Sequence, residues 1–224
     1  MTRPEGAPAV VNPVSEESYR ILRSRLDLSP LPKFSRDVTE RVIHASADFD
    51  YFTDLICDEE SLAEAVAALA AGAPVVADSA MVAAGITGSP VLCKIAEPLT
   101  HRLSRTTGIS TPAAAVRLAF GETGPGAFWV AGGSPEALAE ILSRGVEPAF
   151  VIGLPVGFAG AAEAKDALRA SGIRSVSNVS EKGGPAVAVA AFNALLSSAL
   201  AVPGSRAGWG PEEQAARSDG DGTV

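Results

Sequence analysis

The sequence predicts an α/β fold: a three-layer αβα arrangement in a single domain, with a mostly parallel central sheet. Short apolar runs alternate along the chain with stretches whose apolar residues recur at helical spacing, which is the pattern of successive βα units. The apolar runs are continuous rather than alternating, as expected for strands buried on both faces. With 224 residues, 47% of them hydrophobic, the chain is long enough to bury one sizeable core.

Local signals place the elements in order. The first helix is expected where apolar and charged residues recur at helical spacing, and Ser35 is the expected N-cap of the second. Gly72 and Pro74 end the third helix, and a buried strand follows at once. We expect helices at 14–27, 35–45, 58–71, 98–106, 112–120, 135–144, 161–171 and 185–200, and strands at 74–77, 91–95, 127–131, 149–154 and 175–179.

The two ends of the chain differ from the middle in composition. Residues 1–13 contain proline and glycine without the pattern of a signal peptide, and we expect a flexible N-terminus. Residues 202–224 are rich in Gly, Ser, Pro and charged residues, with Trp209 as their only aromatic, and we expect a disordered tail. The predicted α/β domain therefore spans residues 14–201.

Composition excludes several classes of partner. The formal net charge of −8, with no concentrated basic face, argues against nucleic-acid binding, although an anionic small molecule is compatible with it. Cys57 and Cys93 lie in no CxxC or Cys/His spacing, so we expect reduced thiols and no metal site. No apolar stretch approaches the roughly 20 residues that span a bilayer. We therefore expect a cytoplasmic protein with no membrane partner.

Several predicted loops share a chemistry suited to anions. Residues 78–81 follow a strand, residues 131–136 and 182–185 follow strands and lead into helices, and 110–112 is another helix start. In open parallel sheets ligands collect at such strand ends, where glycines allow close approach and helix N-terminal amides favour negative groups. For any one of these junctions taken alone, ordinary helix capping is the simpler explanation.

Other common ligand-binding and catalytic patterns do not fit. The chain has no G-x-x-x-x-G-K-S/T motif, which excludes a P-loop, and the glycines of residues 153–160 have the wrong spacing for a dinucleotide fingerprint. It also has no G-x-S-x-G motif that would suggest a hydrolase.

The two histidines differ in their surroundings. His101 lies between Thr100 and Arg102 in a predicted surface helix, where a solvated role is expected. His44 has Glu40 four residues before it and Asp48 four residues after it, so a helix would place two carboxylates beside it. Such carboxylates favour the imidazolium form and so a general acid. A purely structural role for His44 stays open on these residues alone.

Four blocks, in order, resemble the precorrin-8 methylmutase family, also called precorrin isomerases, over about residues 14–200. RVIHA at 41–45 is similar to the family's R-x-I-H segment, and AGAPVVADSAMVAAGIT at 71–87 is similar to its AGAP…D-x-x-M-V segment. VIGLPVGF at 151–158, with Lys165 following, resembles the most specific block. Gly183-Gly184 and the NAL at 193–195 resemble the closing segment.

The resemblance implies an isomerase of cobalamin biosynthesis. It would move a methyl group between adjacent carbons of ring C of precorrin-8 or cobalt-precorrin-8, giving hydrogenobyrinate or its cobalt analogue. The resemblance implies His44 as the proton donor, no organic cofactor, and a homodimer. The loops and the resemblance together predict these substrate-binding residues: Ser18, Tyr19, Arg41, Asp78, Met81, Thr87, Ser110, Thr111, Gly132, Gly133, Lys182, Gly183 and Gly184.

The chain also departs from the family's pattern. The loop after Thr87 is short, Thr111 stands where the family has an arginine, Gly133 stands for an asparagine and Pro185 for a serine. Arg20, Arg41 and Lys182 are candidates to supply replacement charge. Two alternatives to an active enzyme therefore stay open: a non-catalytic tetrapyrrole-binding paralogue that has lost the arginine, and an α/β protein whose blocks serve packing alone.

Overall fold

The computed structural model describes residues 13–207, and at its centre lies a five-stranded sheet in the order β1-β5-β4-β3-β2. Strands β2 to β5 are parallel, and only β1 pairs antiparallel, with β5. The predicted mostly parallel sheet is therefore confirmed. The strands are β1 Leu55–Cys57, β2 Val75–Ala77, β3 Phe128–Ala131, β4 Phe150–Gly153 and β5 Ser175–Asn178.

Both faces of the sheet are buried, because successive side chains of a strand point to opposite sides. Phe128 and Phe150 lie in the larger apolar cluster, where their rings stack at 5.2 Å and Phe192 meets Phe128 edge-on. Their neighbours Trp129 and Val151 lie in a second cluster on the other face. This explains why the strands read as continuous apolar runs.

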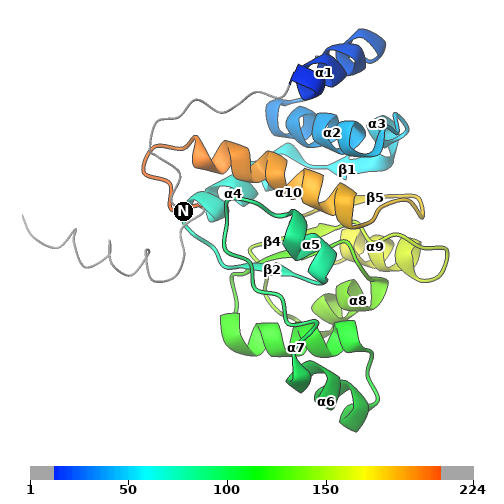
Figure 1. Cartoon of the computed structure of the whole chain (residues 1–224), viewed down its shortest axis with the longest axis vertical. Coiled ribbons are helices and arrows are strands. Elements are labelled where there is room, and N and C mark those ends of the chain that lie inside the picture. The colour runs from blue at the N-terminus through cyan, green and yellow to red at the C-terminus, as the bar shows by residue number, and fades with distance from the viewer. Residues whose placement is uncertain (1–12, 208–224) are drawn as a thin grey trace, which may run out of the picture.

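Helices cover the two faces and complete the three predicted layers (Figure 1). One side carries α2 Lys33–Ser46, α4 Glu59–Ala70, α5 Ala80–Gly85 and α10 Pro185–Leu200, with α1 Pro13–Arg25 outermost and α3 Tyr51–Asp54 preceding β1. The other side carries α7 Thr111–Thr123, α8 Pro135–Arg144 and α9 Ala161–Ala170, with α6 Pro98–Thr107 packed on α7. No helix within residues 13–207 is long and apolar enough to cross a membrane.

Two local expectations are wrong. Residues 91–95 do not form a strand, because only Leu92 makes an isolated bridge, to Val76. Ser35 is not an N-cap: α2 begins two residues earlier, and the Ser35 hydroxyl and amide donate to Glu59 instead. The structure also adds β1, α3 and α5, which the sequence pattern did not indicate.

The predicted terminal segments fall largely on residues 1–12 and 208–224, which lie outside the described residues, and Trp209 is among these. Pro13, predicted within the N-terminal segment, begins α1. Ordered chain extends past residue 201, since the Arg206 amide donates to the Ala70 carbonyl at 2.7 Å and Ala207 is buried.

Candidate functional site

The carboxyl ends of β2 and β3 are joined by the buried carboxylate of Asp78. Its Oδ2 accepts hydrogen bonds from the amides of Gly133, at 2.7 Å, and Ser134, at 3.0 Å. Burial raises the pKa of Asp78 above its usual value, opposed by these amides. Within residues 13–207, Oδ1 has no hydrogen-bond partner. Asp78 is thus a poorly hydrated acid in the loop that leaves β2.

Three of the amides expected to bind anions already have acceptors within the protein. Gly133 and Ser134 donate to Asp78, and the Gly184 amide donates to the Leu154 carbonyl at 2.7 Å. Buried amides need partners, and here the protein itself supplies them. The Ser134 hydroxyl caps α8 by accepting from the amide of Ala137.

Glycine is required where these loops pass one another. At Gly133, a Cβ atom would lie 2.6 Å from the Cβ of Ser79. At Gly183, φ is +147° and a Cβ would lie 2.4 Å from the Leu154 carbonyl oxygen. Both approaches exclude any side chain, so these two predicted ligand-site glycines have a packing role that is sufficient to explain them.

The loop after β5 is organised by a fully buried lysine. The ammonium of Lys165, on α9, donates to Asn178 Oδ1 at 2.8 Å, to the Lys182 carbonyl at 2.7 Å and to the Ser180 carbonyl. Burial lowers the pKa of Lys165 to about 8, partly offset by the charge of Asp54. Lys165 therefore sets the path of the chain into Gly183 and Gly184.

Asp54 holds the same loop from the other side. Its carboxylate accepts from the amides of Val179, at 3.0 Å, and Ser180, at 2.8 Å, and from the Asn178 side chain at 2.8 Å. Burial acts to raise the pKa of Asp54, but these hydrogen bonds outweigh it and the pKa is lowered. The antiparallel pairing of β1 with β5 brings Asp54 to this loop.

Lys182 is paired rather than available as a replacement cation. Its ammonium lies 2.7 Å from Asp48 and 2.6 Å from Asp50, which raises the pKa of Lys182 and lowers that of Asp48. The pair ties the segment after α2 to the segment before α10. The last turn of α2, which carries His44, is thereby held near the carboxyl edge of the sheet.

His44 is half-buried and stacked on Tyr19 of α1. The ring centroids are 4.1 Å apart and the planes are inclined by only 8°. Within residues 13–207, neither imidazole nitrogen takes part in a hydrogen bond. One face of the ring is thus covered, while the nitrogens at its edge have no partner among the described residues.

The two carboxylates that the sequence placed beside His44 are engaged elsewhere. Glu40 accepts two hydrogen bonds from the guanidinium of Arg23, at 2.6 and 2.8 Å. Helix α2 ends at Ser46 with Ala47 in the left-handed conformation, so Asp48 leaves the helical face and pairs with Lys182. The expectation of an imidazole flanked by two carboxylates is wrong, because it assumed a longer helix and unpaired acids.

A hollow of about 440 Å³ lies among α1, α2 and α10, and Tyr19 forms part of its wall. The positively charged side chains Arg23, Lys33 and Arg41 also line this hollow. The first two form ion pairs with acids in the same wall. The Arg41 guanidinium donates to the Ser197 hydroxyl at 3.2 Å and, within the described part of the chain, forms no ion pair with a carboxylate. It is the better placed of the proposed replacement cations, since Arg20 is paired with Glu17.

The other predicted site residues make no hydrogen bond or ion pair with Asp78, Lys165 or His44 among residues 13–207. Met81, on α5, is 68% exposed, and Thr87 is exposed just after that helix. Ser110 caps α7 through Ala113, and Thr111 is the first residue of that helix. Ser18 lies beside Tyr19 on α1 and is half-buried. His101 is exposed on α6, as predicted for a solvated side chain.

Residues missed by the sequence interpretation form the scaffold of the loop after β5. Lys165 stands in the family-like block, but neither spacing nor charge indicated that it is buried. Asp54 and Asn178 carried no sequence signal, because they meet only through strand pairing 124 residues apart in the chain. Among residues 13–207, no group of three or more His, Cys, Asp or Glu could hold a metal ion.

Fold and site together define a single-domain α/β protein with a polar site at the carboxyl edge of a parallel sheet and a stacked histidine beside it. The chain belongs to the precorrin-8X methylmutase family, whose sequence model matches residues 13–198. The predicted family, fold class and enzyme class, a methyl-transferring isomerase, are thereby confirmed.

Individual relatives agree with this assignment. The chain is 35% identical over 196 residues to a precorrin-8X methylmutase of Sinorhizobium sp., covering 82% of this chain and 93% of that one. It is 37% identical over 166 residues to a cobalt-precorrin-8 methylmutase of Salmonella typhimurium, covering 71% and 79%. A crystal structure of precorrin-8X methylmutase from Thermus thermophilus superposes with a TM-score of 0.74 at 30% identity, covering 84% and 98%. These names favour the enzyme over the non-catalytic alternative.

Proposed function

We propose that this chain catalyses the reaction for which its relatives are named, moving a methyl group within ring C of precorrin-8 or cobalt-precorrin-8. His44 acts as the general acid. The observation that carries this role is the half-buried imidazole, stacked on one face and with both nitrogens unpartnered among residues 13–207. A ring held in this way can present a proton to a ligand at its edge.

The proposed reaction requires no co-reactant. One carbon–carbon bond to the methyl group breaks and another forms at the adjacent carbon, so substrate and product are isomers. The proton that His44 gives to the macrocycle returns when the product leaves, and nothing is oxidised or reduced. In this step the protein orients the macrocycle and donates one proton to it.

The family resemblance implies a substrate with several carboxylate arms, and for these we propose that the side-chain cation Arg41 contributes more than the backbone amides at the strand ends. Arg41 lines the hollow beside Tyr19 and has no acidic partner among the described residues. An arginine fork binds a carboxylate through two parallel hydrogen bonds. The remaining predicted contacts, Ser18, Met81, Thr87, Ser110, Thr111 and the loop glycines, belong to the same proposal as the outer wall of the site.

We further propose a homodimer working in the cytoplasm. The dimer follows from the family resemblance. Support for the compartment comes from Cys57 and Cys93, which are both free thiols.

The test is a comparison of His44→Gln with His101→Gln. Conversion is followed by the absorption change from precorrin-8 to the product, and binding by titration with hydrogenobyrinic acid. We expect His44→Gln to lose at least about 100-fold in kcat, with pigment affinity within about threefold, because a general acid acts mainly on the transition state. His101→Gln is the matched control and should behave as wild type.

The outcomes separate the readings. Undiminished turnover by His44→Gln refutes its role as the acid. Binding of the pigment by the wild-type chain without any turnover would instead support the non-catalytic paralogue. In that case Thr111→Arg, which restores the family's arginine, is the variant in which to look for recovered activity.

A further inference from the structure

The stack between Tyr19 and His44 joins the first helix of the chain to the proposed acid. The two rings lie nearly parallel, with centroids 4.1 Å apart. Aromatic rings in contact favour offset parallel stacking, and a cationic imidazolium is attracted to the face of a tyrosine ring. The contact therefore restrains the plane of the imidazole.

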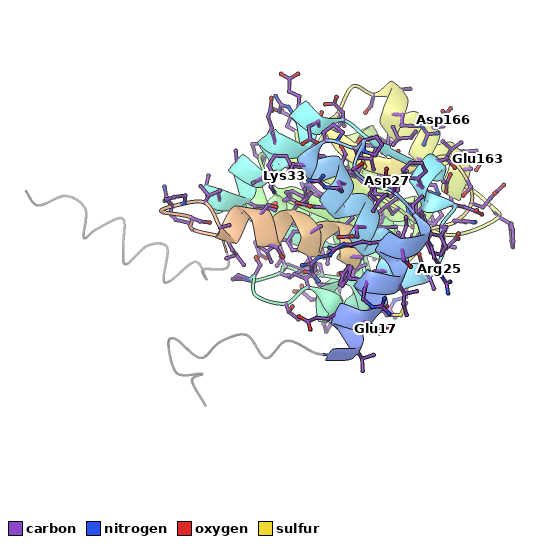
Figure 2. The ribbon with its side chains drawn as sticks, turned by 90° about the horizontal axis from the view of Figure 1, so that it is seen from above. Glu17, Arg25, Asp27, Lys33, Glu163 and Asp166 are labelled. Atoms are coloured by element: carbon purple, nitrogen blue, oxygen red, sulfur yellow. The ribbon has the colours of Figure 1, made fainter. Side chains whose placement is uncertain are left out.

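Helix α1 is the outermost element on this side of the fold, with Glu17 and Arg25 near its two ends (Figure 2). Two further contacts hold it. Leu22 is buried in the main core cluster, and Arg23 binds Glu40 of α2 through two hydrogen bonds. The Arg23 guanidinium also lies 5.6 Å from the Tyr19 ring centroid. These contacts hold the helix that carries the tyrosine ring.

The orientation of His44 depends on this arrangement. The His44 imidazole has no hydrogen bond to any residue in the range 13–207. Its stacking contact with the Tyr19 ring therefore restrains its orientation. The torsion of a histidine about χ2 is broad and two-fold when nothing fixes it. Removing the tyrosine ring would therefore let the imidazole turn and move its nitrogens away from a bound ligand.

We infer that Tyr19 is a positioning residue for His44, holding the imidazole against α1 so that one nitrogen faces the substrate. This inference rests on the proposed function, and it reassigns a residue that the sequence placed among the substrate contacts. The phenolic hydroxyl is not needed for the stack. A phenylalanine at this position should therefore stack equally well.

The test compares Tyr19→Phe with Tyr19→Leu in the full chain. We expect Tyr19→Phe to keep kcat within about twofold, and Tyr19→Leu to lose about tenfold or more in kcat with KM within about twofold, as for loss of orientation alone. Thermal unfolding confirms that both variants are folded. Glu40→Gln, which loosens α1 without changing either ring, should lower kcat in the same direction by a smaller factor.

A second readout does not depend on activity. The chain has only two histidines, so the ring protons of His44 and His101 can be resolved by NMR. A stacked tyrosine should move the His44 resonances upfield of those of exposed His101. We expect that displacement to persist in Tyr19→Phe and to vanish in Tyr19→Leu.

Each alternative result has a definite meaning. Absence of the upfield displacement in the wild-type chain overturns the stack. A raised KM with unchanged kcat in Tyr19→Leu makes Tyr19 a substrate contact and overturns the positioning role. A wild-type chain with the displacement but without turnover shows instead that the proposed function has failed.

Discussion

Replacing Lys165 with methionine tests whether the hydrogen bonds of its ammonium hold the loop after β5, an arrangement we call the Lys165 clamp. The ammonium is 0% exposed and supplies donors to Asn178, Ser180 and Lys182. The two carbonyl groups keep one weaker donor each, from the Asn178 side chain at 3.2 and 3.0 Å. We therefore expect a loss of about 2–4 kcal/mol in unfolding free energy at pH 7, rather than the full cost of three unsatisfied acceptors.

This loss should depend on pH in a definite direction. Burial lowers the pKa of Lys165 from an ordinary value of 10.5 to about 8 in the folded chain. Between those values the unfolded state binds more protons, so the wild-type unfolding free energy rises with pH. The wild-type advantage over Lys165→Met should accordingly grow by about 2 kcal/mol from pH 7 to pH 9.5.

Urea unfolding of both proteins across that pH range measures the difference directly. Lys33→Met is the control, since the side chain of Lys33 is exposed and its ion pair with Asp37 is worth less than about 1 kcal/mol. A difference that stays constant with pH would mean that the three oxygen acceptors keep the ammonium charged, and would refute the pKa argument. A Lys165→Met variant as stable as wild type would refute the clamp itself.

Three further changes test neighbouring features. Gly183→Ala should cost about 1–3 kcal/mol or more, because φ of +147° and the nearby Leu154 carbonyl leave no room for a side chain; unchanged thermal stability would contradict this. Asp54→Asn should make stability less sensitive to acid, since the lowered pKa of Asp54 contributes stability above pH 3.8 that is lost as pH falls; an unaltered acid-unfolding profile would count against it. Ser134→Ala should cost about 1 kcal/mol as a lost helix cap, and Ser134→Asp should restore most of it in the same denaturation assay.

The sequence predicted the sheet well because each parallel strand is buried on both faces and leaves an apolar run. The same pattern gave a wrong prediction at residues 91–95, where the apolar run forms only one isolated bridge. Lys94, within this run, forms ion pairs with Glu97 and Glu122. Strand β1 carried no comparable signal. It has only three residues, and its central Ile56 is exposed at the sheet edge.

The family resemblance offered candidate site residues, but the sequence did not predict the hydrogen-bond partners of those residues. The resemblance selected His44, Tyr19 and Asp78, and all three lie in polar or stacked environments at or near the carboxyl edge. Sequence spacing could not show that Asp78 accepts from Gly133, 55 residues away, or that Glu40 belongs to Arg23. Such pairs depend on how helices pack, and a helical repeat gives information only about neighbours on one helix.

The occupied amides have a consequence for how this chain would grip a substrate with many carboxylates. A carboxylate approaching Gly133 must displace or share the hydrogen bonds of Asp78, and two carboxylates in one site repel unless one binds a proton. The raised pKa of Asp78 moves it toward that protonated form. Arg41 meets no such competition, because its described contact is a neutral hydroxyl. Arg41 therefore offers positive charge without a competing carboxylate, on the helix that also carries His44.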